Sequence, residues 1–68
     1  MFYTYILHSN FLNGYYIGNT GTTLIERLTK HLSSKKGYTS KAKDWVVVYS
    51  ESFTTKADAM LREKEIKN

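Results

Sequence analysis

The sequence predicts an α+β fold, an α/β sandwich in which helices pack against a three-stranded, largely antiparallel sheet, in the order β-β-α-β-α. Three observations lead to this prediction. Two short runs of aromatic and β-branched residues flank a turn, an amphipathic helical pattern follows, and a third strand and a second helix complete the chain. At 68 residues the chain has room for one domain, which we expect to span 1–68.

Two strands joined by a hairpin are predicted at the start of the chain. The segments FYTYILH at 2–8 and YYIG at 15–18 are rich in residues that favour strands. The Asn13-Gly14 pair between them suits a tight turn with positive φ. We therefore expect these strands to pair antiparallel, with a polar turn after Gly18.

The first helix is expected to begin at Thr22 or Thr23 and to end near Ser33. Thr23 and Glu26 match a capping box, in which the threonine oxygen accepts an N–H group that has no partner within the helix. Four apolar residues then recur at the spacing of one helical face: Leu24, Ile25, Leu28 and Leu32. Residues 35–43 are expected to form a loop.

Arg27 and His31 stand four residues apart in this helix, a spacing that places two side chains side by side. Both fall at the edge of the apolar stripe, where a side chain can line a cleft beside the core. Glu26 and Lys30 are predicted to point further out, toward water. A guanidinium and an imidazole on one face, near the tyrosines of the preceding strand, suit phosphodiester chemistry.

The strongest strand signal is the unbroken apolar run WVVVY at 45–49. Its continuity predicts a central strand covered on both faces, with Trp45 and the three valines in the core. A second helix is then expected from Thr54 or Thr55, where Asp58 completes a weaker capping box.

The predicted inner face of the second helix consists of Ala57, Met60 and Leu61, with Glu63 at its edge. An ion pair with Lys67 at i+4 on the helix surface is an ordinary explanation for Glu63. No helix-stop signal precedes the last residue, so we expect the natural domain to continue beyond it.

The composition argues against several classes of protein. The chain has no cysteine and therefore no disulfide or thiolate metal site, which suits the cytoplasm. No segment approaches the roughly 18 apolar residues of a membrane span, so we expect no membrane partner.

Charge is distributed unevenly along the chain. The net charge is +4, and residues 1–25 contain no Lys, Arg, Asp or Glu. Residues 27–43 lack acidic side chains and contain these basic ones: Arg27, Lys30, Lys35, Lys36, Lys41 and Lys43. A basic block beside an aromatic segment is typical of nucleic-acid binders, although a solvated lysine-rich loop explains the charge alone equally well.

Taken together, these residues resemble the GIY-YIG endonucleases over nearly the whole chain. The matching segments, in chain order, are Tyr3-Thr4-Tyr5 and Tyr16-Ile17-Gly18 for the two tyrosine motifs, Arg27 with His31 for the helix motif Arg-x-x-x-His, and Leu61-Arg62-Glu63 for the segment with the metal-binding glutamate. The first tyrosine motif keeps only its last residue, Tyr5, and Asn19 replaces a lysine found in some relatives. The chain is most similar to small stand-alone bacterial members related to the N-terminal nuclease domain of the excision-repair subunit UvrC.

The resemblance implies a metal-dependent endonuclease that hydrolyses phosphodiester bonds of nucleic acid. DNA is the expected substrate. The residues that it implies for catalysis are Tyr5, Tyr16, Arg27, His31 and Glu63. Tyr16 would be the general base, activated by Arg27, the metal and hydrogen bonding from His31. Glu63 would hold one divalent cation, Mg²⁺ or Mn²⁺. The candidates for contact with nucleic acid are Gly18, Asn19, Lys35, Lys36, Lys41 and Lys43.

Other interpretations stay open at this point. Half-buried strand tyrosines and solvated helix side chains explain each residue taken singly. A catalytically inactive nucleic-acid-binding module on the same fold would use the basic loop and the tyrosines, but would not need the carboxylate of Glu63. A small protein-interaction domain would use the apolar aromatic surface instead. Relatives often add a binding domain or oligomerise, so a homo-oligomer is also considered.

Overall fold

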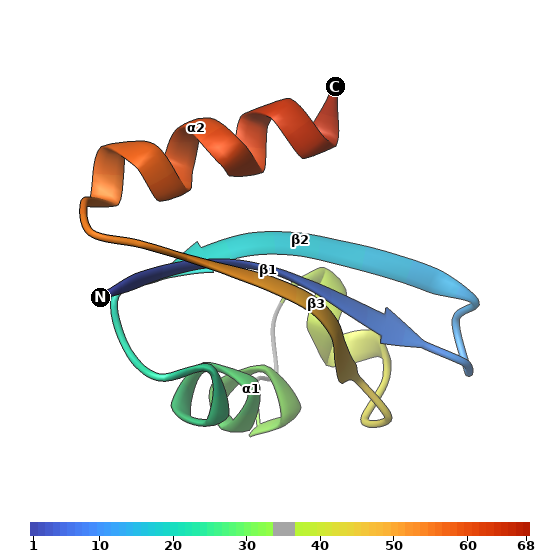
Figure 1. Ribbon diagram of the computed structural model, residues 1–68. Helices are drawn as coiled ribbons and strands as arrows, with labels where there is room; N and C mark the ends of the chain where they lie inside the picture. Colours follow the sequence, from blue (N-terminus) through green and yellow to red (C-terminus); the bar gives the residue numbers. More distant parts are fainter. Residues whose placement is uncertain (34–36) are drawn as a thin grey trace.

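A computed structural model describes residues 1–33 and 37–68 and confirms the predicted α+β fold (Figure 1). Its elements, in chain order, are β1 (Phe2–Ser9), β2 (Gly14–Thr20), α1 (Leu24–Ser33), the short 3-10 helix η1 (Tyr38–Lys41), β3 (Val46–Phe53) and α2 (Lys56–Lys67). The order is the predicted one, apart from η1, which lies in the segment predicted as a loop. Within the described ranges, no helix is long and apolar enough to cross a membrane.

The sheet has the strand order β2-β1-β3, and β1 is antiparallel to both neighbours. The prediction of a central strand at 45–49 is wrong, because β3 is an edge strand and Val46 and Val48 are 53% and 52% exposed. β-Branched residues favour any pleated, half-buried strand, so the apolar run indicates a strand without indicating its place in the sheet. Trp45, just before β3, is buried as predicted.

The N-terminal hairpin joins β1 to β2 at the predicted turn, where Asn13 has a φ of 50°. The predicted end of this strand at Gly18 is wrong, because β2 continues to Thr20 and the turn follows as a bend at Gly21 and Thr22. Gly18 and Asn19 are therefore strand residues, and their side-chain positions alternate between the two faces of the sheet.

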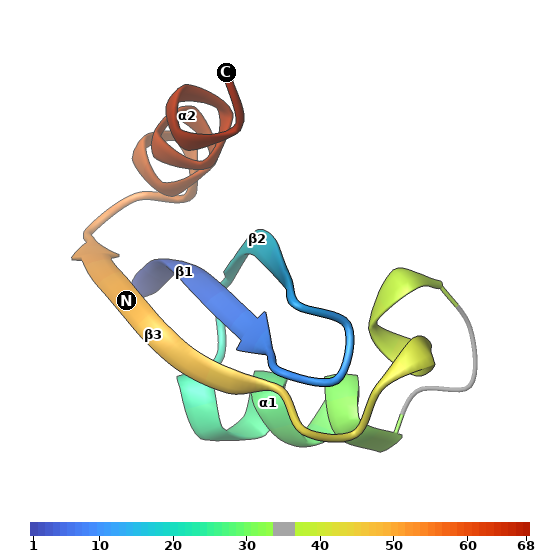
Figure 2. The same ribbon diagram turned by 90° about the vertical axis from the view of Figure 1, so that its right-hand side faces the viewer.

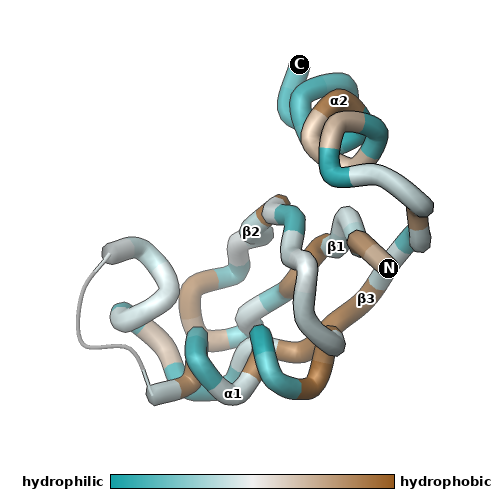
Figure 3. Tube along the Cα trace, turned by 90° about the vertical axis from the view of Figure 1, so that its left-hand side faces the viewer, coloured by the Kyte–Doolittle hydropathy of each residue, from teal (hydrophilic) through white to brown (hydrophobic). Residues whose placement is uncertain are grey.

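The hydrophobic core lies between the sheet and α1. Tyr5, Leu7 and Trp45 form its centre, and three leucines of α1 pack against them: Leu24, Leu28 and Leu32. Ile25, predicted in the same stripe, is mostly exposed. In Figure 3 the hydrophobic stretches run along the strands and onto α1, whereas α2 is mostly hydrophilic.

Both helices begin at the predicted threonine caps. Thr23 Oγ1 accepts a hydrogen bond from the N–H of Glu26 at 3.2 Å, and Thr55 Oγ1 accepts one from the N–H of Asp58 at 3.2 Å. Each cap satisfies an N–H group that lacks a partner within its helix, which fixes where the helix starts.

α2 lies on the opposite face of the sheet from α1 (Figures 1 and 2). On this face Thr4 Oγ1 donates a hydrogen bond to the carbonyl of Ala59 at 2.6 Å, and Ala59 is fully buried. The inner face predicted for α2 is wrong, because Ala57, Met60 and Leu61 are all exposed.

One polar side chain from each strand binds α2. Asn19 of β2, Thr4 of β1 and Glu51 of β3 form a single row across the sheet, because Thr4 pairs with the other two. Asn19 donates to Glu63, and Arg62 Nε donates to Glu51 at 2.7 Å. This polar row is the reason that α2 presents small and polar residues, Glu63 among them, to the sheet.

Candidate active site

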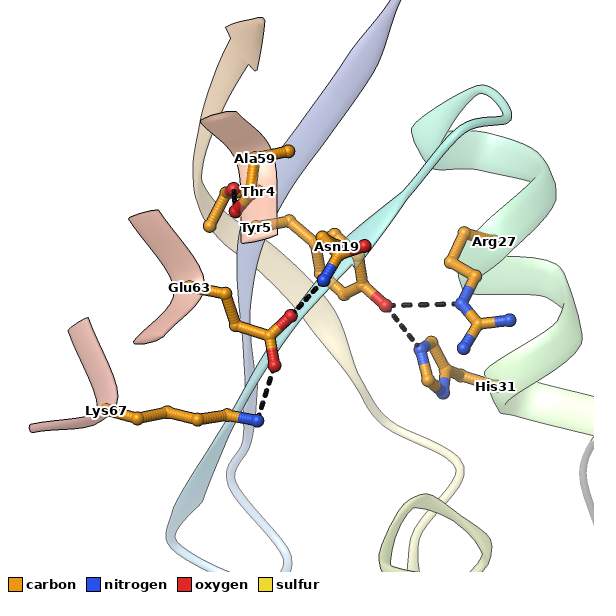
Figure 4. A network of polar contacts seen from close by, with 8 residues as sticks. All are labelled: Thr4, Tyr5, Asn19, Arg27, His31, Ala59, Glu63 and Lys67. Carbon is orange, nitrogen blue, oxygen red and sulfur yellow. Dashed lines mark hydrogen bonds and ion pairs between the residues drawn. The ribbon is translucent and has the colours of Figure 1, made fainter. Parts of the chain in front are cut away.

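A buried hydrogen-bonded cluster joins the sheet to α1 (Figure 4). The Tyr5 hydroxyl lies 2.9 Å from His31 Nε2, and Arg27 Nε donates to the same hydroxyl at 3.2 Å. Tyr5 and His31 are 1% and 6% exposed. The four-residue spacing in α1 thus places two of the predicted site residues on a third, which comes from the central strand.

Arg27 and the protonation of His31 determine the direction of these hydrogen bonds. Arg27 can only donate, so Tyr5 Oη accepts from it, and a neutral His31 gives the Tyr5 proton an acceptor at Nε2. His31 Nδ1 then carries the ring proton and donates to Thr39 Oγ1, 3.2 Å away. Burial, and next the charge of Arg27, lower the pKa of His31, which favours this neutral form.

Tyr5 keeps its proton in this environment. Burial is the largest influence and raises the pKa of Tyr5, while the hydrogen bond and charge of Arg27 act against it. The hydrogen bond with Tyr5 in turn raises the pKa of Arg27. Tyr5 is therefore a neutral phenol hydrogen-bonded to a permanently charged guanidinium group. It does not act as a general base at neutral pH.

Gly18 makes room for the Tyr5 ring. A Cβ atom at Gly18 would lie 2.7 Å from Tyr5 Oη and 3.1 Å from Cε2 of Tyr16. The phenol of Tyr5 therefore passes close over the backbone of β2, and any larger residue at position 18 would displace it. This packing explains the glycine in structural terms, and contact of Gly18 with nucleic acid stays a prediction.

Tyr16 lies beside this cluster and lines a cleft of about 320 Å³. The cleft is bounded by Tyr16, Arg27, Lys30, His31, Gly37, Tyr38 and Thr39. The Tyr16 ring meets that of His31 edge-on, with centroids 5.0 Å apart. The hydrogen bond expected from His31 to Tyr16 is replaced by this ring contact, because the imidazole nitrogens bond Tyr5 and Thr39.

Glu63 approaches the cluster from the α2 side of the sheet (Figure 4). One carboxylate oxygen accepts a hydrogen bond from Asn19 Nδ2, and the other lies 2.5 Å from Lys67 Nζ. The ordinary ion pair with Lys67 thus forms, but the Glu63 side chain is only 18% exposed and its charge raises the pKa of Tyr5. Glu63 does not line the cleft; Figure 4 shows the Tyr5 phenol between Glu63 on one side and Arg27 and His31 on the other.

The Glu63 carboxylate is the ligand here that a hard divalent cation could use, although both of its oxygens contact side-chain nitrogens in this structure. Mg²⁺ commonly binds one or two carboxylates and keeps water and phosphate oxygens as its other ligands. Among residues 1–33 and 37–68 no group of three or more acidic or histidine side chains comes together, so Glu63 would act as a single anchor. Asn19 holds one of its oxygens in place, and Lys67 would have to leave the other.

Lys41 and Lys43, two of the lysines predicted to bind nucleic acid, have different neighbours in the structure. Lys41 Nζ lies 5.7 Å from the centroid of the Tyr38 ring, close to the cleft. Lys43 Nζ donates to the carbonyl of Leu32 at 2.7 Å, near the end of α1. Lys35 and Lys36 lie outside the described residues.

Four residues that line the cleft are absent from the sequence-based site predictions, namely Lys30, Gly37, Tyr38 and Thr39. Lys30 is exposed, as predicted, and also lines the cleft, and its position three residues after Arg27 is a signal that both share a helix face. Tyr38 and Thr39 carry no comparable signal, because their segment lacks a hydrophobic period and was predicted as a loop.

Comparison with known proteins identifies the family of the chain. A family model described as the GIY-YIG catalytic domain matches residues 1–68. No curated protein and no solved structure matches the chain. With its tyrosine motifs on paired strands and its Arg-x-x-x-His helix bonded to Tyr5, the chain belongs to the GIY-YIG family and has that family's nuclease-type fold.

Proposed function

We propose that the chain is an endonuclease that uses a divalent cation to hydrolyse phosphodiester bonds of nucleic acid, with DNA as the proposed substrate. One observation carries the proposal. Tyr5, Arg27 and His31 are joined by hydrogen bonds beside a cleft lined by tyrosines, and the Glu63 carboxylate lies on the other side of the sheet, where Asn19 of β2 binds it. Hydrolysis requires an activated water, charge neutralisation on the phosphate and support for the leaving oxygen. Membership of a nuclease family supports the same activity.

Tyr16 is the proposed general base, in preference to Tyr5. The Tyr5 hydroxyl is buried, keeps its proton and already has two partners. Tyr16 lines the cleft, where an attacking water can come within hydrogen-bond reach. Arg27, whose pKa is raised in part by the charge of Tyr16, is the cation that would stabilise a phenolate there.

Arg27 is the proposed phosphate ligand, and His31 is a positioning residue. Arg27 Nε is occupied by Tyr5, which leaves the terminal amino groups of the guanidinium to meet two phosphate oxygens from the cleft. His31 bonds Tyr5 on one side and Thr39 on the other. It therefore fixes the Tyr5 hydroxyl and, through it, the orientation of the guanidinium.

Glu63 is the proposed ligand of the cation. Its carboxylate is held by Asn19 on the side of the sheet opposite α1, and its charge acts on Tyr5. Mg²⁺ or Mn²⁺ bound there would serve as a Lewis acid for a phosphate oxygen. A phosphate that contacts both would lie beside the edge strand β2, because Arg27 lines the cleft on one face of the sheet and Glu63 stands on the other.

Glu63→Gln tests this function directly. We expect the wild-type chain to cut labelled single-stranded, duplex or branched DNA with Mg²⁺ or Mn²⁺ and to be inactive with a chelator. Glu63→Gln should lower cleavage by about 100-fold or more, because the metal loses its charged ligand, while DNA binding in chelator changes little. Glu65→Gln is the matched control, since it removes the same charge from an exposed position of α2. Equal cleavage by both variants would exclude Glu63 as the metal ligand.

One observation supports a second candidate function, a non-catalytic nucleic-acid-binding module. Both Glu63 oxygens already have partners, because Asn19 donates a hydrogen bond to one and Lys67 forms an ion pair with the other. In that case Glu63 is a clamp between α2 and β2. This function predicts binding without cleavage of any DNA form, and Glu63→Gln would lower the melting temperature instead of an activity.

A further inference from the structure

The part of the cleft next to η1 has no role in the proposed hydrolysis. Tyr16, Arg27 and His31 belong to the cluster already described, and the other lining residues are Lys30, Gly37, Tyr38 and Thr39. None of the described residues that line the cleft is acidic, whereas Arg27 and Lys30 both bring positive charge. An anionic ligand therefore suits this part of the cleft.

The η1 side of the cleft is a fixed wall. Thr39 is buried, bonds His31 through its hydroxyl, and accepts a hydrogen bond from Trp45 Nε1 at 2.9 Å through its carbonyl. The Tyr38 ring packs against Trp45 with centroids 5.6 Å apart. Its hydroxyl lies so close to Gly14 that a Cβ atom there would be 2.5 Å away. Tyr38 is nevertheless 42% exposed, so a positioned aromatic ring remains accessible.

Two lysines lie at or near this part of the cleft. Lys30 lines the cleft and forms no ion pair with any residue in the described part of the chain. Lys41 Nζ lies 5.7 Å from the centroid of the Tyr38 ring. Proteins that bind single-stranded nucleic acid combine cations for the backbone with aromatic rings for the bases.

We infer that this part of the cleft is a subsite for one unpaired nucleotide next to the phosphate that is cut. Lys30 contacts the nucleotide's phosphate, and its base stacks on the Tyr38 ring once the Lys41 ammonium group, which lies over that ring, moves aside. The whole cleft, at about 320 Å³, lies at the lower end of the roughly 300–1,000 Å³ typical of ligand pockets, a size that suits one nucleotide with its phosphate. This subsite rests on the proposed function and specifies its substrate as a strand that is unpaired at the cleavage point.

Binding of two fluorescent probes in the presence of chelator tests the subsite. The probes are a single-stranded thymidine oligonucleotide and the duplex of the same length that it forms with its complement. Lys30→Met should weaken binding of the single strand about fivefold and lower the magnitude of its salt slope by about 0.7, because one phosphate contact is lost. The loss on the duplex should be clearly smaller. Lys64→Met removes the same charge from an exposed position of α2 and should change single-strand binding by less than about twofold.

Tyr38 is tested in the same assay. Tyr38→Leu should weaken single-strand binding about fivefold or more through lost stacking, with a smaller effect on the duplex. Because Tyr38 packs against Trp45, its loss affects folding as well, and circular dichroism is recorded for each variant. Tyr38→Phe keeps the ring and should bind the single strand like the wild type. If Tyr38→Leu does not fold, Tyr38→Phe and the Lys30→Met comparison decide the outcome.

The outcomes separate the subsite from the hydrolysis. Losses that are equal on single strand and duplex, or no larger than those of Lys64→Met, would overturn the subsite. Cleavage by the wild type with Mn²⁺, measured in parallel, tests the proposed function independently. A chain that binds through Lys30 and Tyr38 but does not cut contradicts the hydrolysis alone, whereas a chain that cuts without these preferences contradicts the subsite alone.

Discussion

At the scale of single residues, two tyrosines that look alike in the sequence have different environments. Tyr5 stands on the central strand, and its hydroxyl is enclosed by Arg27 and His31. Tyr16 stands on the edge strand β2, which leaves its ring beside His31 and open to the cleft. Strand order therefore separates a structural phenol from one that can meet a substrate, and strand order is not visible in the motifs.

Tyr16→Phe tests this division of roles. A general base contributes about 10²- to 10⁴-fold to a rate, so the variant should cut at least about 100-fold more slowly in single-turnover assays with Mn²⁺. Its nucleic-acid binding in chelator should match the wild type. Tyr5→Phe provides the comparison, because it removes a hydroxyl that bridges Arg27 and His31 and is expected to lower the melting temperature too. Wild-type turnover by Tyr16→Phe would reject it as the base.

At the scale of elements, local signals predict the type and order of the two α-helices and the three strands, but not the 3-10 helix η1. Thr23 and Thr55 start their helices as predicted, because a cap depends only on neighbours in the sequence. The place of β3 in the sheet and the inner face of α2 depend on long-range pairing. The polar row of Asn19, Thr4 and Glu51 decides that face, and these residues are far apart in the sequence.

The same distinction applies to the site. That Arg27 and His31 share one face of α1 follows from helical spacing, a periodic signal, whereas their hydrogen bonds to Tyr5 depend on the strand order. The surroundings of Glu63 do not follow from such periodic signals, since its hydrogen bond with Asn19 forms only when α2 packs on the sheet. The position of Tyr38 in the cleft wall likewise depends on its packing with Trp45.

Lys67 offers a test at the level of the helix α2. Its ammonium group lies 2.5 Å from a Glu63 oxygen, the atom that a divalent cation would need. An exposed ion pair contributes about 0.2–1 kcal/mol, so Lys67→Met should tighten Mn²⁺ binding by about 1.4- to 5-fold when the pair no longer competes. Isothermal titration without nucleic acid measures this affinity, with Lys64→Met as the charge-matched control. Equal affinities in both variants would mean that Lys67 does not compete with the metal.

At the scale of the whole molecule, the candidate site spans the sheet. α1 and η1 supply the cleft on one face, α2 supplies Glu63 from the other, and β2 runs between them (Figures 1 and 4). His31 is the point where β1, α1 and η1 meet, because it bonds Tyr5 and Thr39 at once. The integrity of the site is therefore linked to the stability of the fold through this buried imidazole.

This linkage predicts a dependence of stability on pH. Burial lowers the pKa of His31 in the folded chain, whereas the unfolded chain has the ordinary value of about 6.5. Below about pH 6.5 the unfolded chain therefore binds more protons, and the free energy of unfolding decreases as the pH falls toward the lowered pKa. The contribution is complete above about pH 6.5, where both states are neutral. Asp44 and Glu51, whose pKa values are lowered, titrate at lower pH than this window.

Urea denaturation at about pH 7.5 and about pH 5.5 measures the effect. His31→Gln removes the titrating group, so it should lose less stability than the wild type between these two conditions, whatever its stability at neutral pH. His8→Gln removes the other histidine of the chain and should keep the wild-type dependence. If the wild type and His31→Gln change in parallel, His31 is not held neutral by the fold, and its neutral tautomer cannot be what orients Tyr5 and Arg27.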